Sequence, residues 1–502
     1  MTNGLGERIE AVMALDPARG AFEYRGEWCT WQSVAEMAHR VEEMLQAAGL
    51  GAGTPIGILL RNRPAHVVSV MQVIASRRCV VALNPFQHPQ KIADDLRRLN
   101  LAVLIADEED WQVGELFEAS REVGSLGISI RSQPALRVER VVGLESLSPS
   151  RKFAEPQPDT CILMLTSGTT GPAKRIQLEY SNFERALFDS MHYESRGGKA
   201  ELQLKETAGL LCTPLVHIGG MYFAMLAIVG ARPLAILEKF SVEEFVRVVS
   251  EHQARTVSLP PTAIRMIIDA QVPPEKLSSL LAIRTGSSPL DPAMAEEFER
   301  IYGFPLLDTY GATEFAGAVA GWTLKDYRLY SKDKRGSVGR AQPGCELRVV
   351  NAEDGSVLGT GKVGLLEVRT AQVDANRWLR TTDLAEIDDD GFLFIRGRAD
   401  DAIMRGGFKV LPRDVEKSLR EHPAVHEACV VGLADDRLGA IPVAAVQLQP
   451  GAPAVTPEEL LGFARQRLVA YQVPAQLKIV EALPRTPSLK VSQHEVRALF
   501  TK

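Results

Sequence analysis

The chain has 502 residues, of which 45% are apolar and 24% are charged, and its net charge is −6. At roughly 150 residues per domain, this length predicts two to four packing units. Because both signs of charge are mixed along the chain and no basic block stands out, the composition argues against a nucleic-acid-binding protein. The six cysteines are scattered without a C-x-x-C pair. This spacing argues against a zinc site or a disulfide framework and favours free thiols in a reducing cytoplasm.

The N-terminal residues 1–20 carry acidic residues early and lack a long apolar core, so they do not resemble a signal peptide. The most membrane-like stretch, at 221–237, contains Arg232 and Pro233. A stretch this short with a charge inside it is more typical of a buried core segment than of a membrane span. We therefore expect a soluble, cytoplasmic protein without a transmembrane segment.

Taken in chain order, short apolar runs first alternate with amphipathic helical patterns. The runs at 55–60, 79–84 and 102–107 are typical of buried strands, and the patterns at 66–76 and 90–99 are typical of helices. Strand–helix–strand alternation of this kind predicts a mostly parallel α/β sheet that is covered by helices.

Between residues 335 and 397 the pattern changes to short alternating strands separated by glycine-rich turns. The strand-like segments are CELRVVN at 345–351, GLLEVRT at 364–370 and GFLFIRG at 391–397. Turn signals at 353–355 and 389–391 fit hairpins between these strands. The pattern predicts a β-rich subdomain over 335–397.

A third pattern follows the GRADD segment at 397–401. Helical patterns at 412–423 and 457–469 flank strand-like runs at 427–433 and 443–450. Together they predict an α+β unit of about 100 residues, which is large enough to fold on its own. We therefore predict an α/β protein with a large N-terminal domain over 1–398, built of α/β subdomains and the β-rich subdomain, followed by a small C-terminal domain over 399–502.

A loop rich in glycine and hydroxyl side chains directly follows the strand-like run CILML at 161–165. The loop consists of Thr166, Ser167, Gly168, Thr169, Thr170, Gly171, Pro172, Ala173 and Lys174. Such a loop leaves backbone N–H groups free to face phosphate oxygens, the hydroxyls add donors, and Lys174 supplies positive charge. The Walker A spacing is absent. Standing alone, the loop is also typical of an ordinary Ser/Thr/Gly surface loop.

Eight further motifs follow this loop in order. They are PLVH (214–217), GSSPL (286–290), YGATE (310–314), GSVGRAQPG (336–344), RTTD (380–383), GRADD (397–401), RGGFKV (405–410) and PRTPSLK (484–490). The series covers nearly the whole chain and resembles the ANL superfamily of adenylate-forming enzymes, in its acyl-CoA synthetase branch. The resemblance implies a large N-terminal domain, a small mobile C-terminal domain, and an enzyme that makes an acyl-AMP and then an acyl-CoA thioester.

The resemblance also implies a nucleotide site. Beside the phosphate loop it includes Gly286, Ser287, Ser288, Pro289, Asp308, Thr309, Tyr310, Gly311, Thr313, Asp383 and Arg398. Tyr310 is expected to stack on adenine, Thr313 to contact the α-phosphate, and Glu314 to hold Mg²⁺. A carboxylate that reaches phosphate through Mg²⁺ makes electrostatic sense, because the metal offsets charge on the departing pyrophosphate. In isolation, the Thr-Glu pair is also typical of a helix N-terminus.

Asp383 is expected to bind both ribose hydroxyls, a role that suits the two oxygens of a carboxylate, with Arg398 assisting. An acid in an exposed turn is the alternative for Asp383. The family more often has glycine at the position of Thr382.

The implied catalytic residues are Lys490, His217, Thr166, Lys174 and Glu314. Lys490 would reach the substrate carboxylate and the α-phosphate, where a fixed cation stabilises charge in the transition state. The family usually has glycine directly before this lysine, whereas this chain has Leu489. Leucine there would stiffen the loop.

An acyl pocket and a hinge complete the implied site. The pocket residues are His217, Gly219, Gly220, Met221, Gly286, Gly311, Ala312 and Gly317. A lone histidine on an apolar segment is also typical of a satisfied core residue. Asp400 corresponds to the hinge, and Gly406 and Gly407 to the loop presented to the CoA thiol. Members that activate acetate carry tryptophan near the position of Gly311, so the glycines favour an aromatic, alicyclic or medium-to-long aliphatic acid.

The implied substrates and cofactors are ATP, Mg²⁺, CoA and a small carboxylic acid, and a homodimer is a fair expectation. Three alternatives stay open. The enzyme could load the acyl group onto a separate carrier protein, or pass it to an amine or oxidise it. From another class, the chain could be a degenerate, non-catalytic binding protein, although the intact motif residues argue against this.

Overall fold

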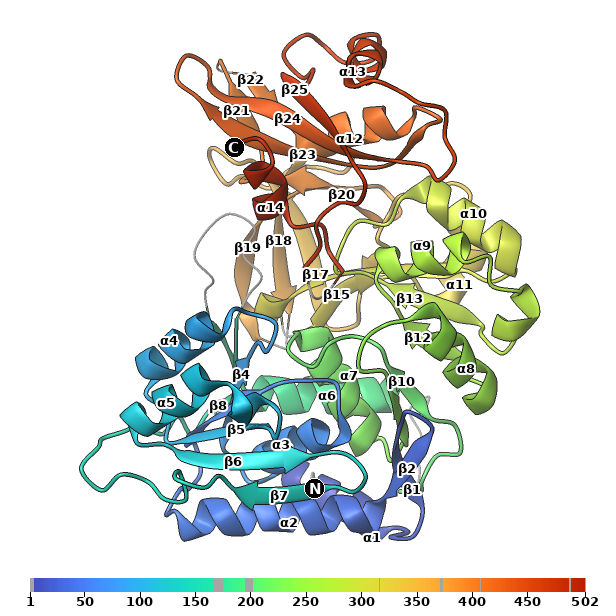
Figure 1. Ribbon diagram of the computed structural model, residues 1–502. Coiled ribbons are helices and arrows are strands. Elements are labelled where there is room, and N and C mark those ends of the chain that lie inside the picture. The colour runs from blue at the N-terminus through green and yellow to red at the C-terminus, as the bar shows by residue number, and fades with distance from the viewer. Residues whose placement is uncertain are drawn as a thin grey trace. The chain divides into compact units, whose positions relative to one another are not determined.

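The computed structural model describes residues 4–165, 175–194, 202–315, 317–370, 373–406, 408–486 and 489–501. The described residues fall into two compact units (Figure 1). Those up to Ala318, together with Val373, form the first unit, and the remaining ones form the second.

A seven-stranded sheet forms the base of the first unit, in the order β7-β6-β5-β3-β4-β8-β9. Its parallel strands are β3 (Pro55–Leu59), β4 (Cys79–Leu83), β5 (Val103–Asp107), β6 (Leu126–Arg131) and β8 (Thr160–Leu165). Antiparallel edge strands close both sides, namely β7 (Arg137–Arg140) and β9 (Arg175–Glu179). The predicted parallel α/β sheet is confirmed.

Helices cover both faces of this sheet because its central strands carry apolar side chains on both (Figure 1). Ile56 and Ile58 pack with α1 (Leu5–Ala14), α2 (Trp31–Ala47) and α3 (Pro64–Ala75). Leu59 and Val81 belong to the opposite core cluster, which includes residues of α4 (Pro89–Leu99) and α5 (Gly114–Val123).

Two smaller sheets complete the first unit. One has the order β10-β11-β1-β2 and consists of β10 (Gly209–Leu211), β11 (Leu234–Ile236), β1 (Gly20–Tyr24) and β2 (Glu27–Thr30). The other contains the parallel strands β12 (Thr256–Ser258), β13 (Ala282–Thr285) and β14 (Leu306–Ala312). The helices of this region are α6 (Tyr180–Glu194), α7 (Ile218–Val229), α8 (Val242–His252), α9 (Pro261–Asp269) and α10 (Pro292–Tyr302).

The apolar stretch at 221–237 forms most of α7 and the strand β11. Met221, Met225 and Ile228 are fully buried, so the stretch is a core segment as expected. Within the described ranges, every helix is too short or too polar to cross a membrane.

The strand β15 (Gly317–Gly321) begins in the first unit and continues into the second, which goes on with α11 (Leu324–Tyr330) and β16 (Arg340–Ala341). An antiparallel sheet follows with β17 (Cys345–Val350), β18 (Gly364–Thr370), β19 (Asp374–Ile387) and β20 (Leu393–Arg398). This sheet is the predicted β-rich subdomain, and Gly391 takes a positive φ of 80° in the turn between β19 and β20.

The C-terminal part is an α+β arrangement, as predicted. Its sheet consists of β21 (Ile403–Arg405), β22 (Phe408–Val410), β23 (Val425–Asp435), β24 (Gly439–Leu448) and β25 (Gln476–Val480). The helices α12 (Pro412–Arg420) and α13 (Pro457–Arg465) share one apolar core with it, and α14 (Gln493–Ala498) shares another. The expected domain junction at 398–401 lies between β20 and β21 and stays a prediction.

One buried titratable group gives the first unit a pH dependence. His66 lies on α3 with no exposed surface. Burial, with the charges of Arg63 and Arg61 as lesser causes, lowers the pKa of His66 to about 3. An unfolded histidine titrates near 6.5, so the unfolded chain takes up this proton while the folded chain does not. Stability from this group is complete above about pH 6.5 and is lost as the pH falls.

We therefore expect His66→Leu to flatten the acid side of the stability curve. Between pH 6 and 4.5 the wild type should lose about 1.4 kcal/mol per pH unit more than the variant. Urea unfolding across this range measures the difference. His39→Leu, at an exposed histidine, is the matched control. Parallel losses in the wild type and His66→Leu would contradict the prediction.

Candidate active site

The motifs GSSPL and YGATE meet at the carboxyl ends of two neighbouring parallel strands. β13 and β14 pair with Thr285 opposite Asp308, so the residues that follow them emerge at the same sheet edge. The Thr309 hydroxyl donates to the Thr285 carbonyl at 2.8 Å. A Cβ at Gly286 would lie 2.7 Å from Thr309 Oγ1 and 2.8 Å from its carbonyl oxygen. The structure thus brings these two predicted segments into direct contact.

Local backbone strain marks the same edge. Ser287 has a φ of 68°, a left-handed conformation that costs a non-glycine residue free energy. Such strain persists only where the surrounding structure fixes the chain, and it clusters at functional sites. The loop then runs through Ser288 and Pro289 to α10, whose first turn is capped by Asp291. The GSSPL turn is therefore a fixed element.

The YGATE segment ends β14 and turns into a short 3₁₀ helix at Thr313–Phe315. The rings of Tyr310 and Phe315 lie 6.4 Å apart at 49°. Glu314 is exposed, and the side chain of Thr313 lies outside the described residues. Phe315 thus packs beside the tyrosine ring, and Glu314 is accessible to an ion or ligand.

Gly311 is explained by main-chain packing. A Cβ at this position would lie 2.3 Å from the carbonyl oxygen of Gly317 and 2.7 Å from the Cα of Ala318. Any side chain would therefore displace the backbone, whatever the size of a neighbouring pocket. The same holds for Gly286. The glycines at 286 and 311 are therefore not evidence for the size of the acid pocket. The expectation of a wide pocket cannot rest on these two residues.

The PLVH motif forms a tight turn at the start of α7. His217 is the N-terminal flanking residue of this helix, and its carbonyl accepts from the Met221 N–H at 3.1 Å. The His217 N–H donates to the Pro214 carbonyl at 3.0 Å. Met221 is fully buried in the core, whereas Gly219 is exposed and His217 half-buried. Of these predicted pocket residues, His217 and Gly219 are thus the ones that reach the surface.

The predicted phosphate loop, Thr166 to Lys174, lies outside the described residues. Its flanking strands are described: β8 and β9 pair antiparallel, with Leu165 opposite Arg175. Arg175 directly follows the motif and is held by the Ala82 carbonyl at 3.2 Å and by an ion pair with Asp95. Arg175, the first described residue after the loop, is therefore anchored to β4 and α4.

Asp383 and Arg398 lie opposite each other on β19 and β20. The Arg398 guanidinium donates to the Thr382 hydroxyl at 2.8 Å and forms an ion pair with Asp400 at 2.7 Å. The predicted ribose residues and the predicted hinge residue are thus brought together. The departure from glycine at Thr382 also has a physical account, since its hydroxyl holds Arg398. No pattern in the sequence predicts that bond.

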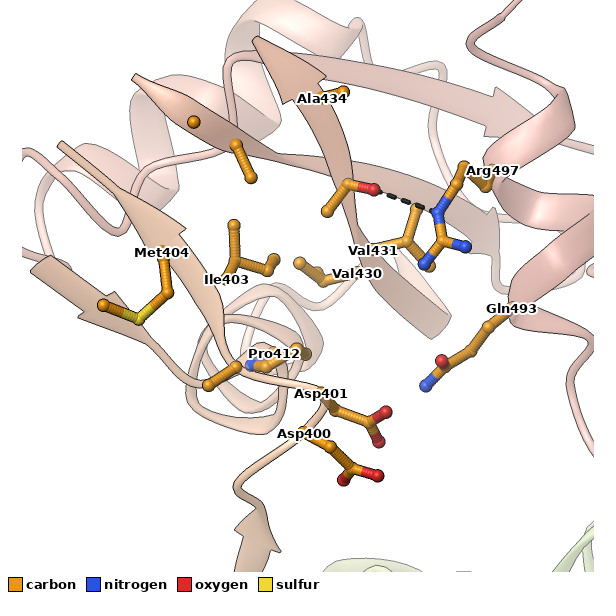
Figure 2. A pocket seen from close by; sticks show the side chains of 14 residues that line it. Asp400, Asp401, Ile403, Met404, Pro412, Val430, Val431, Ala434, Gln493 and Arg497 are labelled. Carbon is orange, nitrogen blue, oxygen red and sulfur yellow. Dashed lines mark hydrogen bonds between the residues drawn. The ribbon is translucent and has the colours of Figure 1, made fainter. Parts of the chain in front are cut away.

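Asp400 also borders a cavity of about 420 Å³ in the second unit (Figure 2). Asp401, Ile403 and Val430 line it as well, and Gln493 and Arg497 reach it from α14. Burial raises the pKa of the Asp401 carboxyl. Nearby, Gly406 is exposed with a φ of 57°, and its N–H donates to the Leu438 carbonyl at 2.8 Å. Gly407 lies outside the described residues.

Lys490 follows a strained residue. Leu489 has a φ of 64°, in the region that favours glycine. A tight turn holds it there: the Thr486 N–H donates to the Lys490 carbonyl at 2.7 Å, and the Leu489 N–H donates to the Thr486 carbonyl at 2.9 Å. Burial lowers the pKa of the Lys490 ammonium from its usual range. The chain therefore keeps the turn of a glycine-containing loop while carrying leucine.

Comparisons with known proteins identify the family of the chain. The family described as AMP-binding enzyme matches residues 9–374, and the AMP-binding enzyme C-terminal domain matches residues 414–490. The chain therefore belongs to the family of AMP-binding enzymes, and the resemblance to adenylate-forming enzymes is confirmed.

Its relatives are ligases of several acids. The chain is 30% identical to a 2-succinylbenzoate–CoA ligase of Bacillus velezensis, over 97% of this chain and 96% of the relative. It is 27% identical to 4-coumarate–CoA ligase 3 of Oryza sativa subsp. japonica, over 94% and 87%. Among solved structures, the o-succinylbenzoate coenzyme A synthetase of Bacillus subtilis with ATP and magnesium ion has a TM-score of 0.77 at 26% identity, covering 98% of this chain and 99% of that one.

The role of Thr382 can be tested by substitution. Thr382→Ala removes a hydroxyl that holds Arg398, so we expect the KM for ATP to rise about fivefold, which corresponds to one hydrogen bond of about 1 kcal/mol. Thr382→Ser keeps the hydroxyl and should stay near the wild type. Initial rates at varied ATP measure the effect. Equal KM values for the two variants would contradict the role of the hydroxyl.

The strain at Leu489 can be separated from the loss of its side chain. Leu489→Gly and Leu489→Ala both remove the side chain, but only glycine adopts this φ without cost. We expect the turn to be about 1 kcal/mol more stable with glycine than with alanine. Native-state hydrogen exchange of the residue-489 amide should then be about fivefold slower in the glycine variant, once intrinsic rates are corrected. Equal protection would show that the turn is unstrained.

Proposed function

We propose that the protein is an AMP-forming acid–CoA ligase. It joins a carboxylic acid to AMP with release of pyrophosphate and then transfers the acyl group to CoA. The observation that carries this proposal is the similarity, over nearly the full length of both chains, to relatives named as CoA ligases. ATP and Mg²⁺ as cofactors and CoA as co-substrate agree with those relatives and with the magnesium–ATP complex of a similar synthetase.

In the nucleotide site, we assign adenine stacking to Tyr310, the ribose hydroxyls to Asp383 with Arg398, and the phosphates to the loop at 166–174. The described geometry supports this assignment. Tyr310 directly follows Thr309, which contacts the start of the strained GSSPL turn, and Arg398 lies opposite Asp383 and is held by Thr382. Glu314 is an exposed carboxylate, which is the type of ligand Mg²⁺ takes together with phosphate oxygens. Bound there, Mg²⁺ would offset the charge of the departing pyrophosphate.

The chemistry has two steps. First, a carboxylate oxygen of the acid attacks the α-phosphorus of ATP, the bond to the β-phosphate breaks, and acyl-AMP and pyrophosphate result. The Lys490 ammonium stabilises negative charge in this step. Second, the CoA sulfur, having lost its proton, attacks the acyl carbon, and AMP leaves with the bonding electrons. We assign Asp400 to the hinge between the two steps and Gly406 and Gly407 to the CoA loop.

We propose an aromatic acid as the substrate. The relatives named for 2-succinylbenzoate and 4-coumarate support this choice within the expected range of aromatic, alicyclic and longer aliphatic acids. Of the proposed pocket residues, Gly286, Gly311 and Gly220 are explained by main-chain packing and Met221 by burial in the core, whereas His217 and Gly219 reach the surface; Ala312 and Gly317 complete the proposed set. A cytoplasmic location, where ATP and CoA are available, and a homodimer complete the proposal.

A panel of carboxylic acids tests this function. We expect pyrophosphate release that depends on one class of acid, with its CoA thioester identified by mass when CoA is present. Release without a thioester in the presence of CoA would favour a carrier-loading or amide-forming enzyme. If every acid failed to cause release with Mg·ATP, the degenerate binding protein would be the better description.

The two steps should separate by mutation. Lys490→Ala is expected to lower acid-dependent pyrophosphate release by roughly a hundredfold or more, as removal of a transition-state cation does. Its conversion of supplied acyl-AMP and CoA to thioester should remain within about threefold of the wild type, because that step does not use this cation. Gly406→Leu is the complementary variant, because it should slow thioester formation and leave pyrophosphate release unchanged. Equal losses in both steps for Lys490→Ala would contradict its assignment.

A further inference from the structure

A buried amide holds the turn that carries His217. Asn62 follows β3, and 5% of its surface is exposed. Its Oδ1 accepts from the Leu215 N–H at 2.8 Å, and its Nδ2 donates to the carbonyls of Thr213 and Leu237, both at 3.1 Å. The side chain thus contacts main-chain groups on both sides of Pro214 with complementary donor and acceptor atoms.

These bonds join two sheets of the first unit. Asn62 lies at the carboxyl end of β3, in the seven-stranded sheet, and Leu237 directly follows β11 in the four-stranded sheet. The Leu237 N–H in turn donates to the Leu211 carbonyl at the end of β10, at 3.1 Å. The turn at 213–217 is therefore fastened where both sheets end.

Arg63, which follows Asn62 in the chain, strengthens this connection between the two sheets. Arg63 forms ion pairs with Glu238 at 2.5 Å and with Asp107 at 3.0 Å, so it fixes the chain beside Leu237. Burial alone would raise the pKa of the Glu238 carboxyl, but hydrogen bonds from Tyr24 and Arg63 outweigh burial and hold it below its usual value. Glu238 is thus an ionised partner at neutral pH, and the junction around Asn62 is rigid.

Main-chain contact confines the same turn from the side of α7. A Cβ at Gly220 would lie 2.3 Å from the Pro214 carbonyl oxygen and 2.6 Å from that of Thr213. At Gly219, the nearest described heavy atom would be Thr213 Cγ2 at 3.8 Å. The turn is therefore held between the Asn62 amide and the backbone of α7, while the surface beside Gly219 stays open.

We infer that Asn62 is a positioning residue for the acid-binding part of the site. It sets the position of His217 and of the first turn of α7 without touching the substrate, and this inference rests on the proposed function. Loss of its bonds would leave the buried N–H of Leu215, the buried carbonyl of Leu237 and the half-buried carbonyl of Thr213 without this partner. For the buried groups this costs more than the bonds themselves contribute. The turn would shift to find other partners, and His217 would move with it.

The test compares two Asn62 variants. Asn62→Asp keeps the acceptor for Leu215 but places a second oxygen against two carbonyls, and Asn62→Ala removes all three bonds. We expect the KM for the acid to rise by roughly ten- to a hundredfold, as for small misplacements of binding groups. The KM for ATP should stay within about twofold, because the GSSPL and YGATE edge is built by other strands.

A matched control separates positioning from stability. Ser125→Ala removes another buried side-chain hydrogen bond, which Ser125 donates to the Leu101 carbonyl at 2.7 Å. This bond lies at the amino ends of β5 and β6 in the same sheet, whereas Asn62 lies at the carboxyl end of β3. We expect it to lower stability with both KM values unchanged. If Asn62→Asp and Asn62→Ala changed the two KM values equally, or neither of them, the positioning role would be wrong.

Hydrogen exchange decides the matter even if the proposed function fails. If the wild type releases no pyrophosphate with any acid, the proposed function is wrong. The hydrogen bonds between Asn62 and the turn at 213–217 can still be examined. Peptides covering 210–221 should then exchange at least about tenfold faster in Asn62→Asp, with no such change in Ser125→Ala. Unchanged exchange in this segment would overturn the inference whatever the activity.

Discussion

The candidate site depends on the close approach of main-chain segments at a few glycines. At Gly220, Gly286 and Gly311 a single methyl group would come within 2.3 to 2.7 Å of a neighbouring oxygen. Protein interiors are packed too densely to absorb such a clash by a small shift. Each glycine therefore ties a motif to another part of the first unit: α7 to the PLVH turn, the GSSPL turn to Thr309, and the YGATE strand to Gly317. The motifs keep their positions because backbones, rather than flexible side chains, set the distances.

This constraint changes how glycine in such a motif is interpreted. The sequence indicated that glycine in place of a larger residue widens the acid pocket, which treats glycine as empty space. In the structure, the space beside Gly311 is filled by the backbone of Gly317, and the space beside Gly286 by the hydroxyl and carbonyl of Thr309. Both glycines therefore restrict the chain instead of opening a pocket. Gly219 differs, because a Cβ there would keep ordinary distances to its surroundings. Substrate size is therefore better sought around Gly219 and His217.

The sequence predicted the fold well where periodicity is strong. Strands such as β3, β4 and β5 are short apolar runs bounded by turns, and α4 between β4 and β5 shows a clear 3.6-residue pattern. The helix α3 differs, because its residues 64–74 are all buried. The length of β19 was not predicted, because its 14 residues, DANRWLRTTDLAEI, mix charged and apolar residues without strict alternation. That strand pairs on both sides, with β18 and β20, so cross-strand bonds determine its length. Such long-range pairing leaves little trace in local sequence.

Within the site, motifs identified the residues of the expected chemistry, but not the residues that hold them. The bonds of Asn62 and Thr382 depend on which backbone groups come within reach after folding, and a single asparagine or threonine carries no such signal. Strain at Ser287 is equally invisible, since this residue appears ordinary until its positive φ value is known. Leu489 was marked by the glycine that the family has there, but its positive φ is known only from the structure. Supporting hydrogen bonds and positive φ values are therefore known only from the three-dimensional structure.

The group around Arg398 shows why such supporting residues bear on function. One guanidinium donates to the Thr382 hydroxyl and to the Asp400 carboxylate, and it lies opposite Asp383 in the register of β19 and β20. A nucleotide that engaged Arg398 would compete with Asp400 for the same donors, because a guanidinium has a fixed number of N–H groups in a planar fork. The free energy of nucleotide binding is then coupled to the free energy of the conformational change at Asp400. This coupling is reciprocal, so each equilibrium shifts the other by the same free energy. The proposed hinge would therefore respond to the nucleotide through a single side chain.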